Sequence, residues 1–187
     1  MAMLMFRPQV QPQPKFQTGM TDPYINETVT YVAELDEEAI RKGIMQPYLF
    51  VFIPTLIVGI FCPLFCIMAW IMYSCAKKQS NSAVEGTHVY ITEKTLVYII
   101  GGRPIEFSRV TIPVANIASV TVQPPYTVIN IKPTAPEVIL SRPGYSGGYG
   151  DNDTVPTLQT YATRSVPIPH LKNAETFAEV LCEVITK

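Results

Sequence analysis

The chain has 187 residues, of which 14 are lysine or arginine and 15 are aspartate or glutamate, so its formal net charge is −1. This balance argues against a nucleic-acid-binding protein, which carries a basic patch or stripe. Charged residues make up only 16% of the chain and the mean hydropathy is +0.19, because no charged residue occurs between Lys42 and Lys77. The four cysteines do not form a secreted-type disulfide framework, and we interpret them as reduced thiols.

The amino-terminal region, residues 1–32, is rich in proline and glutamine at its start and shows no apolar periodicity there. This composition predicts a flexible tail. Within it, Asn26 begins an N-glycosylation sequon, which is used only if the amino terminus is luminal or extracellular. Residues 33–46 are predicted to form a short juxtamembrane helix, because acidic residues come first and basic residues follow, as suits the helix dipole.

The longest apolar run lies within residues 47–76 and predicts a segment embedded in a lipid bilayer. Residues 49–74 are uncharged, and a helix needs about 20 apolar residues to cross a hydrocarbon core of about 30 Å. Pro54 and Pro63 disfavour a straight helix. Two arrangements stay open: a single kinked transmembrane span, which the length favours, and a shallow hairpin. The hairpin turns near residues 59–63, and its legs of about 11 and 13 residues are too short to cross.

Basic residues flank this apolar run on both sides, and we expect them to lie at the membrane surface. Arg41 and Lys42 precede the run, and Lys77 and Lys78 follow it. The positive-inside rule compares the basic residues on the two sides of the run, and their numbers are equal here, as a hairpin would give. For a single span, the two lysines lie nearer the run and favour a cytoplasmic carboxy-terminal part. Cys75 stands next to the lysines and is a candidate for S-acylation, with an unmodified thiol as the alternative.

The remaining chain comprises a polar linker over residues 77–86 and a domain over residues 87–187. Asn173 is a good N-cap for a final amphipathic helix. Short β-like runs broken by turn residues fill the rest of the domain, so we expect an α+β fold with mostly antiparallel strands and one terminal helix. The predicted strands are residues 88–92, 95–100, 104–112, 118–122, 127–131, 137–140 and 158–166, and the apolar helix face is Phe177, Val180, Leu181, Val184 and Ile185.

Residues 87–186 resemble the membrane-anchored PH-like domains of the bacterial-PH and GRAM group. The resemblance rests on THVYITEKTLVYII, RVTIPVANIASVTV and PIPHLKNAETFAEVLCEVI. It implies a hydrophobic anchor, here an amino-terminal membrane helix as a kinked span or hairpin, before an antiparallel β-sandwich or barrel capped by the carboxy-terminal helix. The glycine-rich insertion at residues 142–156 departs from that compact pattern. Lys94, Arg103 and Arg109 are scattered among acidic residues, so the resemblance does not imply phosphoinositide headgroup binding.

No arrangement of residues in the sequence predicts catalysis, a cofactor or a metal site. His88 and His170 are isolated, and we interpret them as structural histidines. Residues 151–153 imitate the start of a calcium loop but lack the glycine and glutamate at the required spacing. The glycine-rich residues 147–150 are not followed by a helix pattern, so a flexible loop is predicted rather than a phosphate site.

These expectations combine into a non-enzymatic, membrane-anchored adaptor or accessory subunit. Its PH-like domain, expected in the cytoplasm, would contact another membrane protein or complex. The alternative is a lipid-sensing or membrane-shaping protein with a hairpin anchor, and a membrane enzyme is a third, weaker interpretation because the catalytic motifs are missing. The sequence indicates neither the partner nor the organelle.

Overall fold

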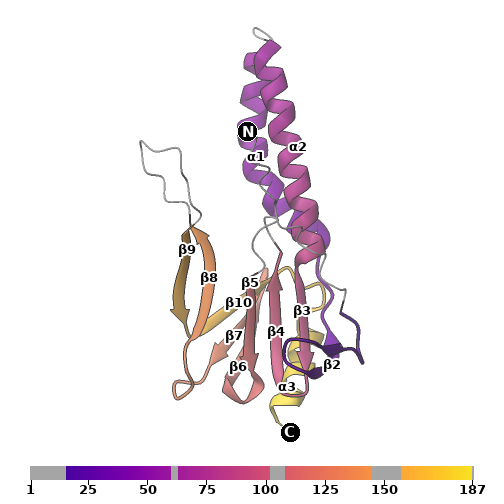
Figure 1. Ribbon diagram of the computed structural model, residues 1–187, viewed down its shortest axis with the longest axis vertical. Helices are drawn as coiled ribbons and strands as arrows, with labels where there is room; N and C mark the ends of the chain where they lie inside the picture. Colours follow the sequence, from indigo (N-terminus) through magenta and orange to yellow (C-terminus); the bar gives the residue numbers. More distant parts are fainter. Residues whose placement is uncertain (1–15, 60–62, 102–107, 145–156, 187) are drawn as a thin grey trace, which may run out of the picture.

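A computed structural model describes residues 16–59, 63–101, 108–144 and 157–186, and it shows a long helical hairpin standing on a β domain (Figure 1). The third helix lies against the β domain at the end far from the hairpin. The elements in chain order are β1 (Thr21–Asp22), β2 (Glu27–Val32), α1 (Glu37–Gly59), α2 (Pro63–Gly86), β3 (His88–Thr92), β4 (Thr95–Ile100), β5 (Ser108–Pro113), a 3-10 turn (Val114–Asn116), β6 (Ile117–Gln123), β7 (Tyr126–Ile131), β8 (Val138–Gly144), β9 (Thr157–Thr163), β10 (Ser165–Pro169) and α3 (Ala174–Ile185).

The strands of the β domain pair antiparallel throughout the described residues. They form a five-stranded sheet in the order β1-β2-β3-β4-β5, a three-stranded sheet in the order β10-β7-β6, and the β8-β9 pair. The predicted α+β class and antiparallel pairing therefore agree with the structure. The run predicted as one strand over residues 158–166 is divided, because β9 pairs with β8 whereas β10 pairs with β7.

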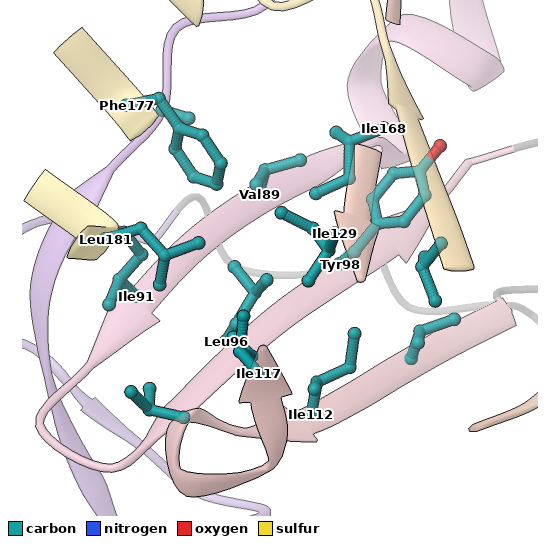
Figure 2. Close-up of a cluster of buried hydrophobic side chains, with 14 of the residues drawn as sticks. Val89, Ile91, Leu96, Tyr98, Ile112, Ile117, Ile129, Ile168, Phe177 and Leu181 are labelled. Carbon is teal, nitrogen blue, oxygen red and sulfur yellow. The ribbon is translucent and has the colours of Figure 1, made fainter. Parts of the chain in front are cut away.

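One hydrophobic core lies between the two larger sheets and beneath α3. Phe177 and Leu181 of α3 point toward the strands (Figure 2) and are 1% and 0% exposed. The alternating burial of β7 explains its orientation, since every second side chain of that strand faces inward. The strand residues labelled in this core are Val89, Ile91, Leu96, Tyr98, Ile112, Ile117, Ile129 and Ile168.

The opposite face of β3 and β4 is also buried, and the amino-terminal segment covers it. Phe16 is 6% exposed and stacks on Tyr90 with ring centroids 4.4 Å apart, while Val29 of β2 packs in the same cluster. The prediction of a flexible tail over residues 1–32 is therefore wrong for residues 16–32, and residues 1–15 lie outside the described part. Strand β2 is short and half polar, so it shows little of the apolar periodicity that identifies a strand from sequence.

The apolar run is divided between two antiparallel helices that pack along each other (Figure 1). Helix α1 ends at Gly59 and α2 begins at Pro63, so the chain reverses direction between a glycine and a proline, both of which disfavour a continuous helix. Among the described residues, neither helix combines the length and the apolar character needed to cross a membrane. The prediction of a transmembrane helix is therefore wrong. A membrane span needs about 20 apolar residues in a row, whereas each of these helices consists of a short apolar half and a polar half.

The polar halves of the two helices include residues that were predicted as separate segments. The juxtamembrane helix predicted over residues 33–46 begins only at Glu37, as the start of α1, because Leu35 forms a β-bridge with Leu171. The predicted linker of residues 77–86 is the last part of α2. Helix α1 has Asp36 at its start, whose carboxylate accepts a hydrogen bond from the Ala39 amide at 3.0 Å, as an N-cap does. Each helix is thus continuous from its polar half, beside the β domain, to its apolar half.

Candidate functional site

The half of the hairpin that lies away from the β domain carries an unusual concentration of exposed, large apolar side chains. We call residues 49–57 of α1 and 64–73 of α2 the apolar end. The large apolar side chains exposed there have fractional exposures from 38% to 73%. The side chains are Leu49, Phe50, Val51, Ile53, Leu56, Ile57, Leu64, Phe65, Ile67, Met68, Trp70, Ile71 and Tyr73.

The buried side chains of α2 are instead small ones. Ala69, Ala76 and Ala83 recur at intervals of seven residues and are 0%, 0% and 2% exposed, and Ser80 is 2% exposed. Two turns of helix take about seven residues, so the three alanines lie on one face. Small side chains at such a face let two helix backbones approach closely. Helix α2 therefore buries small residues and exposes large apolar ones, the reverse of a helix that packs in water.

Three contacts across the hairpin set the level of each side chain along it. The Tyr48 hydroxyl donates to Gln79 Oε1 at 3.0 Å, and the rings of Phe52 and Tyr73 lie 5.6 Å apart. Closer to the β domain, the Arg41 guanidinium donates to Asn81 Oδ1. These contacts place residues 77–78 of α2 at about the level of Tyr48. Above that level the chain is uncharged, and α1 rises about 17 Å from there to its end at Gly59 at 1.5 Å per residue.

The basic residues predicted at the membrane surface come together on one side of the apolar end. Arg41, Lys42, Lys77 and Lys78 are all exposed, and the antiparallel hairpin places all four between the apolar end and the β domain. Arg41 is also drawn toward Glu37, with an N–O distance of 3.9 Å. Within the described chain, no ion pair involves Lys77 or Lys78.

The two cysteines in the described part of the hairpin are free thiols. Cys75, the predicted S-acylation candidate, is exposed on α2 just below the apolar end, and Cys66 is exposed within it. Cys62 lies outside the described residues. Cys182 is exposed on α3. Modification of Cys75 stays a prediction.

The hairpin is joined to the sheet at its base by a close backbone contact. The Gly101 amide donates to Thr87 Oγ1 at 3.0 Å, and this hydroxyl donates in turn to the Ala83 carbonyl at 2.7 Å. A Cβ at Gly101 would lie 2.5 Å from that carbonyl oxygen. On the other helix, the Asp36 amide donates to the His170 carbonyl at 2.7 Å. The helices are thus attached to both sheets, which couples the direction of the hairpin to the orientation of the β domain.

A second polar cluster, centred on Asp22, was not identified from the sequence. Asp22 is 0% exposed and accepts hydrogen bonds from the Tyr90 hydroxyl at 2.5 Å and from the Tyr24 amide at 2.9 Å. It also forms an ion pair with Arg109, whose guanidinium carbon lies 4.9 Å from the centre of the Tyr24 ring. The one local pattern that indicates part of this cluster is Asp-Pro-Tyr at residues 22–24, because an aspartate side chain commonly accepts a hydrogen bond from the backbone amide two residues later.

The electrostatics of this cluster suit a structural role. Burial raises the pKa of the Asp22 carboxyl, but the hydrogen bonds from Tyr90, Tyr24 and Arg109 outweigh it and hold the pKa below its usual value. Burial and the hydrogen bond to Asp22 raise the pKa of Tyr90. Arg109, one of the three scattered basic residues noted in the sequence, thus forms an ion pair within the domain. The cluster fastens the amino-terminal segment to β3 and β5.

The remaining predicted residues do not gather into a site. His88 lies at the start of β3 with its ring 6.2 Å from that of Phe16, and His170 follows β10 with a positive φ of 60°. Over residues 16–59, 63–101, 108–144 and 157–186, no three histidine, cysteine, aspartate or glutamate side chains are grouped to hold a metal ion. Arg103 and residues 147–153, on which the phosphate and calcium interpretations were considered, lie outside the described residues.

No protein-family model, curated protein or solved structure matches this chain. The resemblance to PH-like domains therefore stays a prediction. The functional argument rests on the surface of the hairpin and on its attachment to the β domain.

Proposed function

We propose that the protein is a non-enzymatic, membrane-associated adaptor. The apolar end of the hairpin sits in one leaflet of a lipid bilayer without crossing it, and it holds the β domain at the membrane surface. There the β domain contacts another protein of a membrane complex, as PH-like domains do. The observation that supports this proposal best is the reversed hairpin, with alanines inside and large apolar side chains outside.

Water is an unfavourable surrounding for the apolar end. Burying a large aliphatic or aromatic side chain gains about 1.5–3 kcal/mol. The thirteen side chains are already partly covered, and even a third of that gain for each amounts to a total on the order of 10 kcal/mol. Exposed apolar areas of this size mark interaction or membrane surfaces.

The directions of the side chains favour lipid over a protein groove. Successive helix residues point about 100° apart. Phe50 and Val51 of α1 are 73% and 51% exposed, and Met68 and Trp70 of α2 are 55% and 70% exposed. The outward faces of both helices are therefore apolar over a wide arc. A groove in a protein covers a single stripe of a helix, whereas acyl chains surround a hairpin on every outward face.

The length of the apolar end matches one leaflet. It rises about 17 Å above the level of Tyr48, and one leaflet of hydrocarbon is about 15 Å thick. Tyr48 lies at the boundary level and Tyr73 near it, a depth that tyrosine favours. Both helices return to the same side, so the β domain and the four basic residues stay together outside the bilayer.

Flotation of the full chain with phosphatidylcholine vesicles tests the attachment. Replacing Ile53, Ile57 and Ile67 by serine should weaken binding at least tenfold, because three apolar contacts with acyl chains are lost. The matched control is Ile139→Ser on β8, an isoleucine that is 67% exposed but lies in the β domain. The proposal fails if the wild type does not float, or if the control variant weakens binding as much as the triple variant.

The adaptor part is tested by chemical cross-linking in native membranes through the exposed lysines of the β domain, Lys94 and Lys172. We expect one reproducible partner, which is lost when the triple serine variant detaches the protein. Cross-linking that captures no partner contradicts the adaptor role and leaves the attachment intact.

A second candidate function is membrane shaping, favoured by the depth of the apolar end. A hairpin that occupies one leaflet enlarges that leaflet alone, and binding of such helices depends on curvature. Dense coverage of vesicles should then produce tubules visible by electron microscopy. Unchanged vesicles at saturating protein contradict this function.

A further inference from the structure

The geometry of the hairpin points to anionic lipid headgroups as the ligands of a basic collar, formed by Lys77 and Lys78 at the boundary level and Lys42 below it. We propose that this collar makes the protein select negatively charged membranes by charge, without recognising one headgroup. The inference rests on the proposed attachment and adds the lipid class that the attachment prefers.

The two boundary lysines are placed where headgroups lie. The contact between Tyr48 and Gln79 puts Lys77 and Lys78 at the level at which the uncharged part of the hairpin begins. Both side chains are exposed. When the apolar end fills the hydrocarbon of one leaflet, these ammonium groups lie among the phosphates rather than in bulk water.

The acidic residues of the hairpin are too far away to neutralise the two boundary lysines, Lys77 and Lys78. Glu85 follows Lys78 by seven residues, which separates them by about 10 Å along α2. Glu37 and Glu38 stand at the start of α1, near the β domain, about 15 Å below Tyr48. Charges separated by more than about 8–10 Å are largely screened at physiological salt, so the bilayer meets the positive charge of the lysines.

Arg41 contributes less than its position in the sequence indicates. Its guanidinium donates to Asn81 and lies 3.9 Å from a carboxylate oxygen of Glu37. An arginine engaged in this way offers less charge to a membrane. The structure thus distinguishes the four flanking cations, which the sequence presents as equivalent pairs.

The test compares binding of the full chain to neutral phosphatidylcholine vesicles and to vesicles with 30% phosphatidylserine. A lysine near an anionic surface adds about 1 kcal/mol, so two lysines should account for about 30-fold tighter binding to the anionic vesicles. Lys77→Gln/Lys78→Gln should remove that enhancement and leave binding to neutral vesicles unchanged. High salt should also remove it.

Two controls distinguish the collar from positive charge elsewhere on the chain and from recognition of one headgroup. Lys94→Gln/Lys172→Gln changes the net charge equally but in the β domain, and it should preserve the enhancement. Vesicles with phosphatidylglycerol at the same charge should bind as tightly as those with phosphatidylserine, and a difference above tenfold indicates headgroup recognition and overturns the charge-only inference.

The outcomes distinguish this inference from the proposed function. Equal binding of the wild type to neutral and anionic vesicles overturns the collar but leaves the attachment. Loss of binding to both kinds of vesicle in the Lys77/Lys78 variant shows that the lysines act structurally, which also overturns the inference. Absence of wild-type binding to any vesicle contradicts the attachment itself.

Discussion

Asp22 shows how a single buried charge fastens a segment that the sequence describes as a tail. The carboxylate is 0% exposed and receives donors from β3, β5 and its own turn. Removing one partner of a buried ion pair leaves an uncompensated charge and costs several kcal/mol. Asp22 and Arg109 are 87 residues apart in the chain, so local patterns give no indication of their pairing.

The hydrogen bonds to Asp22 predict a pH dependence of the free energy of unfolding. The pKa of Asp22 is lowered in the folded protein, so its contribution is complete above the unfolded value of about 3.9. As the pH falls below about 4 through the folded pKa, the contribution is lost, because the unfolded chain binds the proton more tightly. Denaturation of the full chain between pH 5 and 2 should show a smaller decline in Asp22→Asn than in the wild type. Parallel curves contradict this assignment.

At the scale of the element, the hairpin depends on a close contact at its base and small residues along its seam. Alternation and helical spacing identified β7 and α3, because each has one buried face. The short apolar runs between turn residues also identified β3 and β4 with their observed bounds, but alternation gave no indication that both faces of these strands are buried. The second face is covered by Phe16 and Val29, from a distant part of the chain.

The contact at Gly101 predicts opposite effects for two glycine substitutions. Gly101→Ala should lower the free energy of unfolding by about 1–3 kcal/mol, because the new methyl group meets backbone atoms and the nearest is 2.5 Å away. Gly43→Ala in α1 is the matched control. The nearest atom there is a side-chain nitrogen at 3.8 Å, and alanine favours a helix by up to about 1 kcal/mol. Thermal unfolding of both variants measures the difference, and a stabilised Gly101→Ala contradicts the close contact.

At the scale of the whole molecule, α3 completes the core that the sheets enclose. Helix α3 packs on β6 of the three-stranded sheet, and the Phe177 ring lies 6.4 Å from that of Tyr31 on β2 of the five-stranded sheet. The hairpin at the other end is attached to the same sheets through Gly101 and Asp36. The β domain thus holds the base of the hairpin through both of its larger sheets.

The core position of Phe177 predicts a large effect on the stability of the domain. Phe177→Ala should lower the free energy of unfolding by about 3–5 kcal/mol, since it removes a fully buried aromatic side chain and leaves a cavity. Cys182→Ala, at an exposed position of the same helix, should change it by less than about 0.5 kcal/mol. Calorimetry of the full chain measures both. Similar transition temperatures for the two variants contradict the burial of Phe177.

The sequence by itself determined the antiparallel α+β domain, the terminal helix and the uncharged apolar run, because these depend on composition and on the period of a strand or helix. Only the tertiary structure decided that the apolar run is a hairpin in which neither described helix is long and apolar enough to cross a membrane. The reversal between Gly59 and Pro63 and the seam of alanines are contacts between separate segments. The same holds for the basic collar, since Lys42 lies near Lys77 and Lys78 only after the chain has folded back.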